Sequence, residues 1–176
     1  MEWYNEPPSW REEGDRLVVQ AGAETDCWRV TLHDYVADDA HFYHRAVDGD
    51  FTATVEFAGD YGSQYDQAGL MVRDSEERWL KCGIEYVDGA QQASAVVTRA
   101  FSDWSVVPLD DDPESVWIRV ERTGPAIEVF FSRNGREFTM IRQAYLTETE
   151  TLRVGPMAAA PRGDGFETVF ENFDVA

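Results

Sequence analysis

Several short stretches of the chain alternate between apolar and polar residues, and this period of two determines the secondary structure to expect. The clearest is 51–57, FTATVEF, in which Phe, Ala, Val and Phe alternate with Thr, Thr and Glu. Successive side chains of a β-strand point to opposite faces of a sheet, whereas an amphipathic helix has a period near 3.6. The pattern therefore predicts a strand with one apolar face turned toward a core.

About a dozen such stretches follow one another, and none has helical periodicity. We expect strands at 16–20, 26–33, 41–47, 51–57, 67–73, 79–86, 94–101, 104–107, 116–122, 127–133, 136–142, 152–157 and 166–175. Asn134 and Gly135 predict a two-residue hairpin turn, because a tight primed turn needs positive φ at both positions. Many short strands at regular spacing predict an all-β fold of two antiparallel sheets, a β-sandwich or jelly roll, in a single domain over 1–176.

The charge balance restricts the classes of partner. The chain has 34 acidic and 15 basic residues, a formal net charge of −19, and Lys81 as its only lysine. Nucleic acids and anionic membranes bind basic patches, so we expect neither as a partner. The acidic, lysine-poor composition has two interpretations, an adaptation to high salt or the codon bias of a GC-rich genome, and the residues do not separate them.

The remaining composition favours a globular protein without a metal or cofactor. Hydrophobic residues make up 43% of the chain, which is typical of a folded domain. Cys27 and Cys82 are the only cysteines and belong to no CxxC motif or Cys/His cluster, so we expect buried free thiols rather than a zinc site. No signal peptide and no membrane-spanning run is visible, and a cytoplasmic location is the default expectation.

A polar face is predicted where two neighbouring strands carry charge at one parity only. In 67–73 and 79–86 the even residues are apolar, so a pairing of the two strands would place them in a core. The odd residues, on the opposite face, include Gln67, Gly69, Arg73, Trp79, Lys81, Gly83 and Glu85. A glycine inside a strand often marks the close approach of a ligand or of another backbone, so the two glycines fit a binding face.

This face has the residue types of a saccharide-binding site. Sugars are typically held by an aromatic ring that stacks on the pyranose and by planar polar side chains that bond the hydroxyls. The candidates for stacking are Trp79, Trp104 and Tyr43, and the candidates for hydrogen bonding are Gln67, Arg73, Lys81, Glu85 and Arg99. Two simpler interpretations stay open, a solvated sheet face with a bend and, for Trp104, a buried anchor beside the turn at 102–103.

Catalytic residues are less well indicated. Glycosidases need two carboxylates that flank the scissile bond, and Glu85 has no acidic residue two positions away on its strand. Lys81 and Glu85 are four residues apart on one strand face, so they are candidates for a base and an acid, with His41 as a third catalytic candidate. The alternative, which we favour, is that Lys81 and Glu85 form a salt bridge.

Several segments resemble those of a known protein family. They are WYNEPPSW, TDCWR, the HF pair at 41–42, GDFTATVEFAGDY, YDQAGLMVR, WLKCGIEYVDG, QQASAVVTR, FSDWSVVP and the closing FENF. Over essentially its whole length the chain resembles an uncharacterised bacterial and fungal domain-of-unknown-function family with a concanavalin A-like fold, which includes a fungal regulation-of-enolase protein. That family usually has an aromatic residue where Cys27 stands. The resemblance implies a two-sheet sandwich of the lectin and glucanase type, and it brings no established reaction.

Three functions follow as hypotheses. The leading one is a non-catalytic module that binds a saccharide or a related small polar metabolite on the polar face. The first alternative is a sugar-active enzyme, a hydrolase or lyase, that uses Glu85 and Lys81. The second alternative is a protein-interaction or regulatory domain that has a protein partner and no small ligand.

Overall fold

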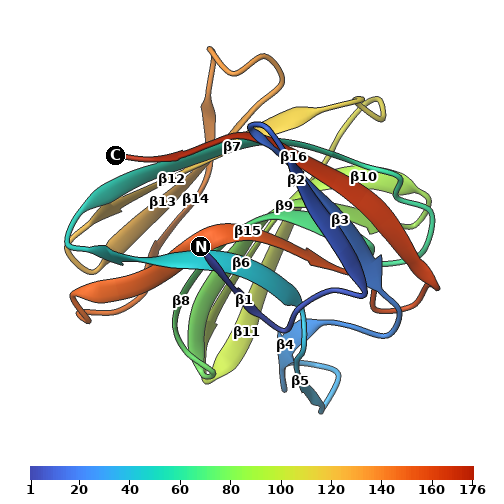
Figure 1. Ribbon diagram of the computed structural model, residues 1–176. Helices are drawn as coiled ribbons and strands as arrows, with labels where there is room; N and C mark the ends of the chain where they lie inside the picture. The colour runs from blue at the N-terminus through green and yellow to red at the C-terminus, as the bar shows by residue number, and fades with distance from the viewer.

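Apolar side chains of two facing sheets form the core of the protein. The computed structural model describes residues 1–176, and no helix that could cross a membrane is present. The first sheet consists, in spatial order, of β1 (Glu2–Tyr4), β6 (His41–Asp48), β15 (Thr151–Ala159), β8 (Gln67–Ser75), β9 (Arg78–Val87), β10 (Ala90–Arg99) and β11 (Phe101–Pro108). The second consists of β14 (Thr139–Tyr145), β13 (Ala126–Ser132), β12 (Val116–Thr123), β7 (Phe51–Gly59), β16 (Gly165–Val175), β3 (Arg16–Gly22) and β2 (Ser9–Glu13). Figure 1 shows the second sheet above the first, and the predicted antiparallel sandwich is confirmed.

The space between the sheets contains the larger of two apolar clusters. This cluster has 28 buried residues, drawn from both sheets. Phe51, Ala53, Val55 and Phe57 of β7 all belong to it, as their alternation predicts. Each large apolar side chain that leaves water contributes roughly 1.5–3 kcal/mol, so this cluster supplies most of the hydrophobic stabilisation.

A short two-stranded ribbon covers the outer face of the first sheet. It consists of β4 (Cys27–Arg29) and β5 (Val36–Asp38), and Figure 1 shows it below that sheet. A second apolar cluster of 9 buried residues lies between ribbon and sheet, with Trp28 of the ribbon and Trp79 of β9 among its members. The ribbon is therefore attached by a smaller apolar contact than the one that joins the two sheets.

The strand predicted at 26–33 is only partly formed. The chain is extended at Cys27–Arg29 and then turns, with positive φ at Val30, Leu32 and Asp34. Of the apolar residues in that alternation, Trp28 is buried but Leu32 is 91% exposed at the tip of the ribbon. The alternation was misleading because the chain reverses here before it can form a longer strand.

The hairpin predicted at Asn134-Gly135 is also wrong in its turn type. β13 ends at Ser132 and β14 begins at Thr139, so the connection is longer than two residues. Asn134 caps this loop, because its side-chain oxygen accepts the backbone N–H groups of Arg136 and Glu137 at 3.0 Å. The two-residue turn with positive φ at both positions occurs instead at 88–89, Asp-Gly, between β9 and β10.

Gly69 and Gly83 face each other across β8 and β9 at an unusually close approach of two backbones. A Cβ on Gly69 would lie 2.0 Å from the carbonyl oxygen of Cys82, and one on Gly83 would lie 2.0 Å from that of Ala68. The neighbouring strand therefore accounts for both glycines, and no ligand is needed to explain them.

Candidate functional site

The predicted polar residues of β8 and β9 lie together beneath the ribbon. Gln67 is paired with Glu85 across the two strands, and Lys81 lies on the same sheet face. All three are buried, with exposed fractions between 4% and 7%. The expectation that they share one face is confirmed, but this face is enclosed by the ribbon and is not a solvated sheet surface.

Asp26 connects these polar residues to the ribbon. Its Oδ1 accepts hydrogen bonds from the Lys81 ammonium (3.3 Å), the Gln67 amide (3.4 Å) and the Cys27 backbone N–H (2.7 Å). Its Oδ2 accepts the hydroxyl of Tyr35 at 2.6 Å. The residue immediately before β4 thus brings a carboxylate to the centre of the polar face.

The ion pair of Lys81 is with Asp26 and not with Glu85. The expected salt bridge between Lys81 and Glu85 is therefore wrong. The physical reason is that the ribbon supplies a nearer carboxylate, which spacing along β9 does not indicate. Glu85 is left without an ion pair in a buried position.

Glu85 has one bonded and one free carboxyl oxygen. Ser94 and Trp104 donate to Oε2, each at 2.8 Å, and no protein group donates to Oε1. Burial raises the pKa of Glu85 above its ordinary value, although the charge of Lys81 and the two hydrogen bonds act in the opposite direction. The free oxygen is available to a ligand.

Replacing Glu85 with Gln is expected to make stability less dependent on pH. A carboxyl with a raised folded-state pKa favours folding fully below its unfolded pKa of about 4.3, and this contribution is lost as pH rises through the folded pKa. The stability of Glu85→Gln relative to wild type should therefore increase from about pH 4 to about pH 7. Urea unfolding across this range measures the difference. A difference that stays constant across this range would contradict the prediction.

A small cavity lies between the polar residues and the ribbon, and we call it the ribbon pocket. It is lined by Asp26, Trp28, His33, Tyr35, Tyr65, Gln67, Lys81, Glu85 and Trp104. Its volume of about 40 Å³ holds a few water molecules but no sugar ring. Trp104 is 37% exposed and meets Tyr65 edge to face, with ring centroids 6.4 Å apart. The pocket is thus polar at its base and aromatic at its rim.

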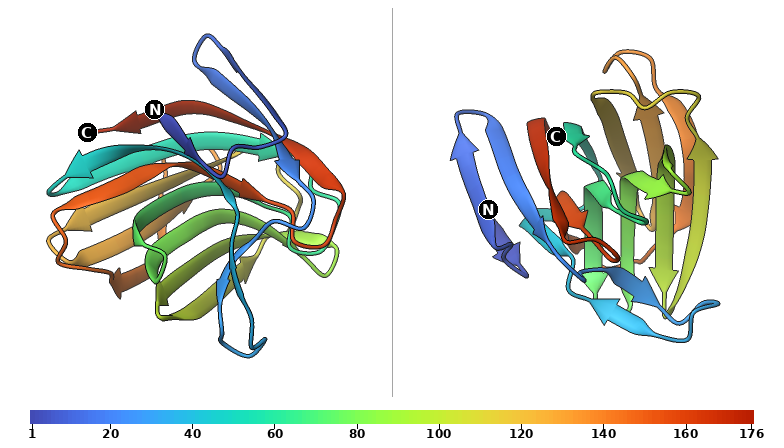
Figure 2. Two further views of the ribbon diagram at one scale, coloured as in Figure 1. Left: turned by 60° about the horizontal axis from the view of Figure 1, so that its bottom comes forward. Right: turned by 90° about the vertical axis from the view of Figure 1, so that its right-hand side faces the viewer.

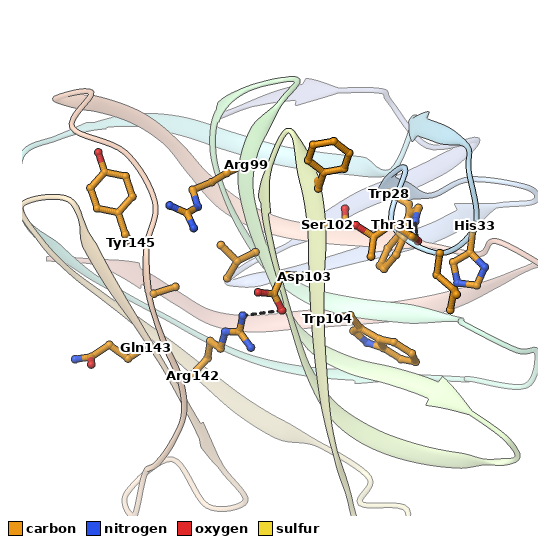
Figure 3. Close-up of a pocket in the computed structure, with 14 residues that line it drawn as sticks. Trp28, Thr31, His33, Arg99, Ser102, Asp103, Trp104, Arg142, Gln143 and Tyr145 are labelled. Carbon is orange, nitrogen blue, oxygen red and sulfur yellow. Dashed lines mark hydrogen bonds and ion pairs between the residues drawn. The ribbon is translucent and has the colours of Figure 1, made fainter.

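A larger hollow adjoins the ribbon pocket and shares Trp28, His33 and Trp104 with it. Its volume is about 760 Å³. Figure 3 shows His33 and Trp104 on one side of β11, and Arg142 and Tyr145 on the other. The hollow therefore has two parts on opposite sides of this edge strand, and only the part beside Trp104 opens toward the ribbon pocket.

Arg73 attaches the ribbon to the first sheet. Its two terminal nitrogens donate to both carboxylate oxygens of Asp38 in β5, at 2.6 and 2.7 Å. Tyr4 donates to the same carboxylate at 2.8 Å, and its ring lies 4.4 Å from the Arg73 guanidinium. These contacts occupy the groups with which Arg73 was expected to bind a ligand.

Two aromatic residues expected to stack on a ligand lie elsewhere. Trp79 is fully buried beneath the ribbon, where its indole N–H donates to the carbonyl of Glu76 at 3.3 Å. Tyr43 lies on the inter-sheet side of β6, packed against Trp3 and Trp10. Trp104 is the one of the three candidates that the structure places at the ribbon pocket.

Arg99 and His41 also lie apart from the ribbon pocket. Arg99 is exposed at the end of β10 and points to the inter-sheet side, over the ring of Tyr145. His41 is buried, where its Nε2 accepts the backbone N–H of Gly22 at 2.9 Å and its Nδ1 donates to the carbonyl of Asn5 at 2.8 Å. Burial lowers the pKa of His41. Both ring nitrogens bind backbone groups, so His41 has a structural role.

Six residues of the site were not among the candidates of the sequence analysis: Asp26, Trp28, His33, Tyr35, Asp38 and Tyr65. They lie in the ribbon or in the loop before β8, and only the three-dimensional structure brings them to the sheet face. The TDCWR and YDQAGLMVR segments contain or border Asp26 and Tyr65, so the family resemblance was the one available signal. No group of three His, Cys, Asp or Glu side chains is close enough together to hold a metal ion.

Comparison with known proteins agrees with this architecture. The sequence model of the family described as "Protein of unknown function (DUF1349)" matches residues 3–176. Regulation of enolase protein 1 of Saccharomyces cerevisiae is 33% identical over 173 residues, which are 98% of this chain and 87% of the yeast protein. A crystal structure of a functionally unknown protein from Saccharomyces cerevisiae has a TM-score of 0.96 at 32% identity, and covers 99% of this chain and 95% of its own.

More distant structures share the fold alone. The carbohydrate-binding module CBM66 of Bacillus subtilis has a TM-score of 0.63 at 11% identity, over 98% of this chain and 94% of the module. A GH43 protein of Bacillus licheniformis has a TM-score of 0.69 at 18% identity, over 97% of this chain and 35% of that protein. The β-sandwich is therefore one that carbohydrate-binding and GH43 proteins also use.

Proposed function

The chain belongs to the protein family described as "Protein of unknown function (DUF1349)". We propose, from its ribbon pocket, that it is a non-catalytic binding module for a saccharide or a related small polar metabolite. The observation that carries the proposal is the position of Trp104. Its ring is partly exposed at the rim, while its indole N–H is fixed by Glu85. A rigid, exposed aromatic ring beside buried polar groups is the usual arrangement for holding a sugar.

The size of the ribbon pocket defines how such a ligand would bind. A sugar ring does not fit a cavity of about 40 Å³, but a hydroxyl or hydroxymethyl substituent does. The ring would lie on Trp104, and the substituent would reach the free Oε1 of Glu85. The rest of a longer ligand would occupy the adjoining hollow on the same side of β11.

The polar base of the pocket favours a ligand with hydroxyl groups. Glu85 offers an acceptor in this pocket, and Lys81, which donates one of its three N–H groups to Asp26, offers the remaining two as donors. Glu85 Oε1 has no protein donor, so it can accept a hydrogen bond from a ligand hydroxyl without breaking an existing protein contact. The fold neighbour named as a carbohydrate-binding module supports the same ligand class.

Replacing Trp104 with Ala is expected to weaken ligand binding at least tenfold, about 1.4 kcal/mol, because both the stacking surface and a donor to Glu85 are lost. The ligand is first identified by a glycan array and a thermal-shift screen of sugars and polyols, and affinities are then measured by calorimetry. Val107→Ala is the control, because Val107 is an exposed apolar residue of the same strand that lines neither the ribbon pocket nor the adjoining hollow. If Trp104→Ala binds every hit as tightly as wild type, the ribbon pocket is not the binding site. The protein-interaction alternative is then favoured.

A sugar-active enzyme is the second candidate, and one observation favours it. Two carboxyl groups in different environments, Asp26 paired with Lys81 and Glu85 with its raised pKa, line the same pocket. Acid and base roles in glycoside cleavage are divided between carboxyls in this way. If the wild-type protein hydrolyses aryl glycosides and Glu85→Gln does not, the protein is an enzyme. If the wild-type protein binds a sugar tightly but does not cleave it, the binding module is supported.

A further inference from the structure

Two arginines lie directly opposite each other at one end of the first sheet. Arg78 begins β9, Arg99 ends β10, and the two are register partners on the inter-sheet face. Like charges in directly opposed positions of a strand pair destabilise a sheet unless a counter-charge lies between them. The chain has 34 acidic residues, so carboxylates near this pair are the expected source of the counter-charge.

The available carboxylates compensate the pair only in part. Arg78 forms one ion pair, with Asp74 Oδ2 at 3.2 Å. The same oxygen accepts the hydroxyls of Thr147 (2.9 Å) and Thr149 (3.2 Å), so its acceptor capacity is used. Arg99 forms no ion pair, and its guanidinium lies 5.5 Å from the ring centroid of Tyr145. All five N–H donors of Arg99 are therefore available to a ligand.

Both guanidinium groups line a cavity of about 310 Å³. The segment that leads from β14 to β15 forms the facing wall, and the complete lining is Arg78, Arg99, Tyr145, Leu146, Thr147, Glu148 and Thr149. Asp74 does not belong to this lining, and its carboxylate is bonded to Arg78, Thr147 and Thr149 of the lining. Glu148, an exposed residue, is the one acidic group of the cavity.

We propose that this cavity binds a dianionic phosphate group, either inorganic phosphate or a phosphomonoester. The planar fork of a guanidinium matches two phosphate oxygens, and two opposed forks can share one dianion. The bound charge would relieve the repulsion between Arg78 and Arg99. Figure 3 shows Arg99 and Tyr145 on the side of β11 away from Trp104, so the phosphate cavity is separate from the ribbon pocket.

The test compares melting temperatures in sodium phosphate and in sodium chloride at equal ionic strength, because salt alone stabilises a chain of net charge −19 by screening. At ten times its Kd, inorganic phosphate should raise the Tm of the wild-type protein by about 3–6 °C above the chloride value. A parallel titration with glycerol phosphate distinguishes the sources. A shift with the ester indicates a phosphomonoester site, and a shift with inorganic phosphate alone indicates a site for free phosphate.

Arg99→Gln should weaken phosphate binding at least tenfold and remove the Tm increment. Its chloride Tm should be equal to that of wild type or slightly higher, because Arg99 is exposed and its repulsion with Arg78 is removed. Arg136→Gln is the matched control, since Arg136 is also an exposed arginine without an ion pair but does not line the cavity. The proposal is overturned if phosphate and chloride give the same Tm for wild type, or if Arg99→Gln keeps the full increment. Calorimetric titration of phosphate into both variants provides the second readout.

Discussion

Replacing Asp38 with Ala should destabilise the protein by about 3–5 kcal/mol, because it leaves the guanidinium of Arg73 charged and unpaired in a buried site. Arg73 is only 2% exposed, and both of its terminal nitrogens are bonded to Asp38. Urea unfolding followed by circular dichroism measures the loss.

Two further variants separate this charge effect from a loss of packing. The double variant Asp38→Leu, Arg73→Met removes both charges and should recover most of the stability, since well-packed apolar pairs replace buried ion pairs with little cost. Asp111→Ala breaks an exposed ion pair, with Arg133, and should cost no more than about 1 kcal/mol. A double variant as unstable as Asp38→Ala would mean that the shape of the ribbon contact matters more than its charges.

Replacing Gly69 with Ala is expected to cost about 3 kcal/mol, because the new methyl group would overlap the backbone of β9. Its position is 2.0 Å from the Cys82 carbonyl oxygen and 2.6 Å from the Gly83 Cα. A flexible side chain could move aside, but both contacts are with backbone atoms of a central strand pair. Relief therefore requires that β8 and β9 separate.

The matched control for this substitution is Gly62→Ala. Gly62 has no atom within 4 Å of the position that a Cβ would take, and it lies in a loop. Its replacement should change stability by less than about 0.5 kcal/mol. Equal effects of the two substitutions in thermal unfolding would show that the close approach of the strands is not what requires a glycine at 69.

Parity within a strand predicted the core correctly, because it depends only on local geometry. Leu70 and Val72 of β8 and Leu80 of β9 are fully buried between the sheets, as their even positions indicate. Gln67, Lys81 and Glu85 share the other face for the same reason. No local pattern indicated that this face would itself be covered, because the covering residues, Asp26 and Asp38, belong to a segment at least 29 positions away in the chain.

Which residues of two neighbouring strands share a sheet face was not predictable, because it depends on the register of the hairpin that joins them. The two-residue turn at 88–89 pairs Val87 with Ala90, so odd positions of β9 face the same way as even positions of β10. Ser94 therefore reaches Glu85, whereas Arg99 points to the opposite face. The assignment of Arg99 to the polar face assumed a parity that this turn reverses.

The ribbon also gives the chain two thiols that become reactive in different events. Burial raises the pKa of Cys27 to about 12 and raises that of Cys82 as well, so neither is a thiolate in the folded protein at neutral pH. Cys27 belongs to the small apolar cluster under the ribbon, and Cys82 belongs to the large cluster between the sheets. Detachment of the ribbon alone would uncover the first thiol and leave the second protected. Oxidation or alkylation would then trap the ribbon-open form at Cys27, whereas damage at Cys82 requires that the sandwich itself come apart.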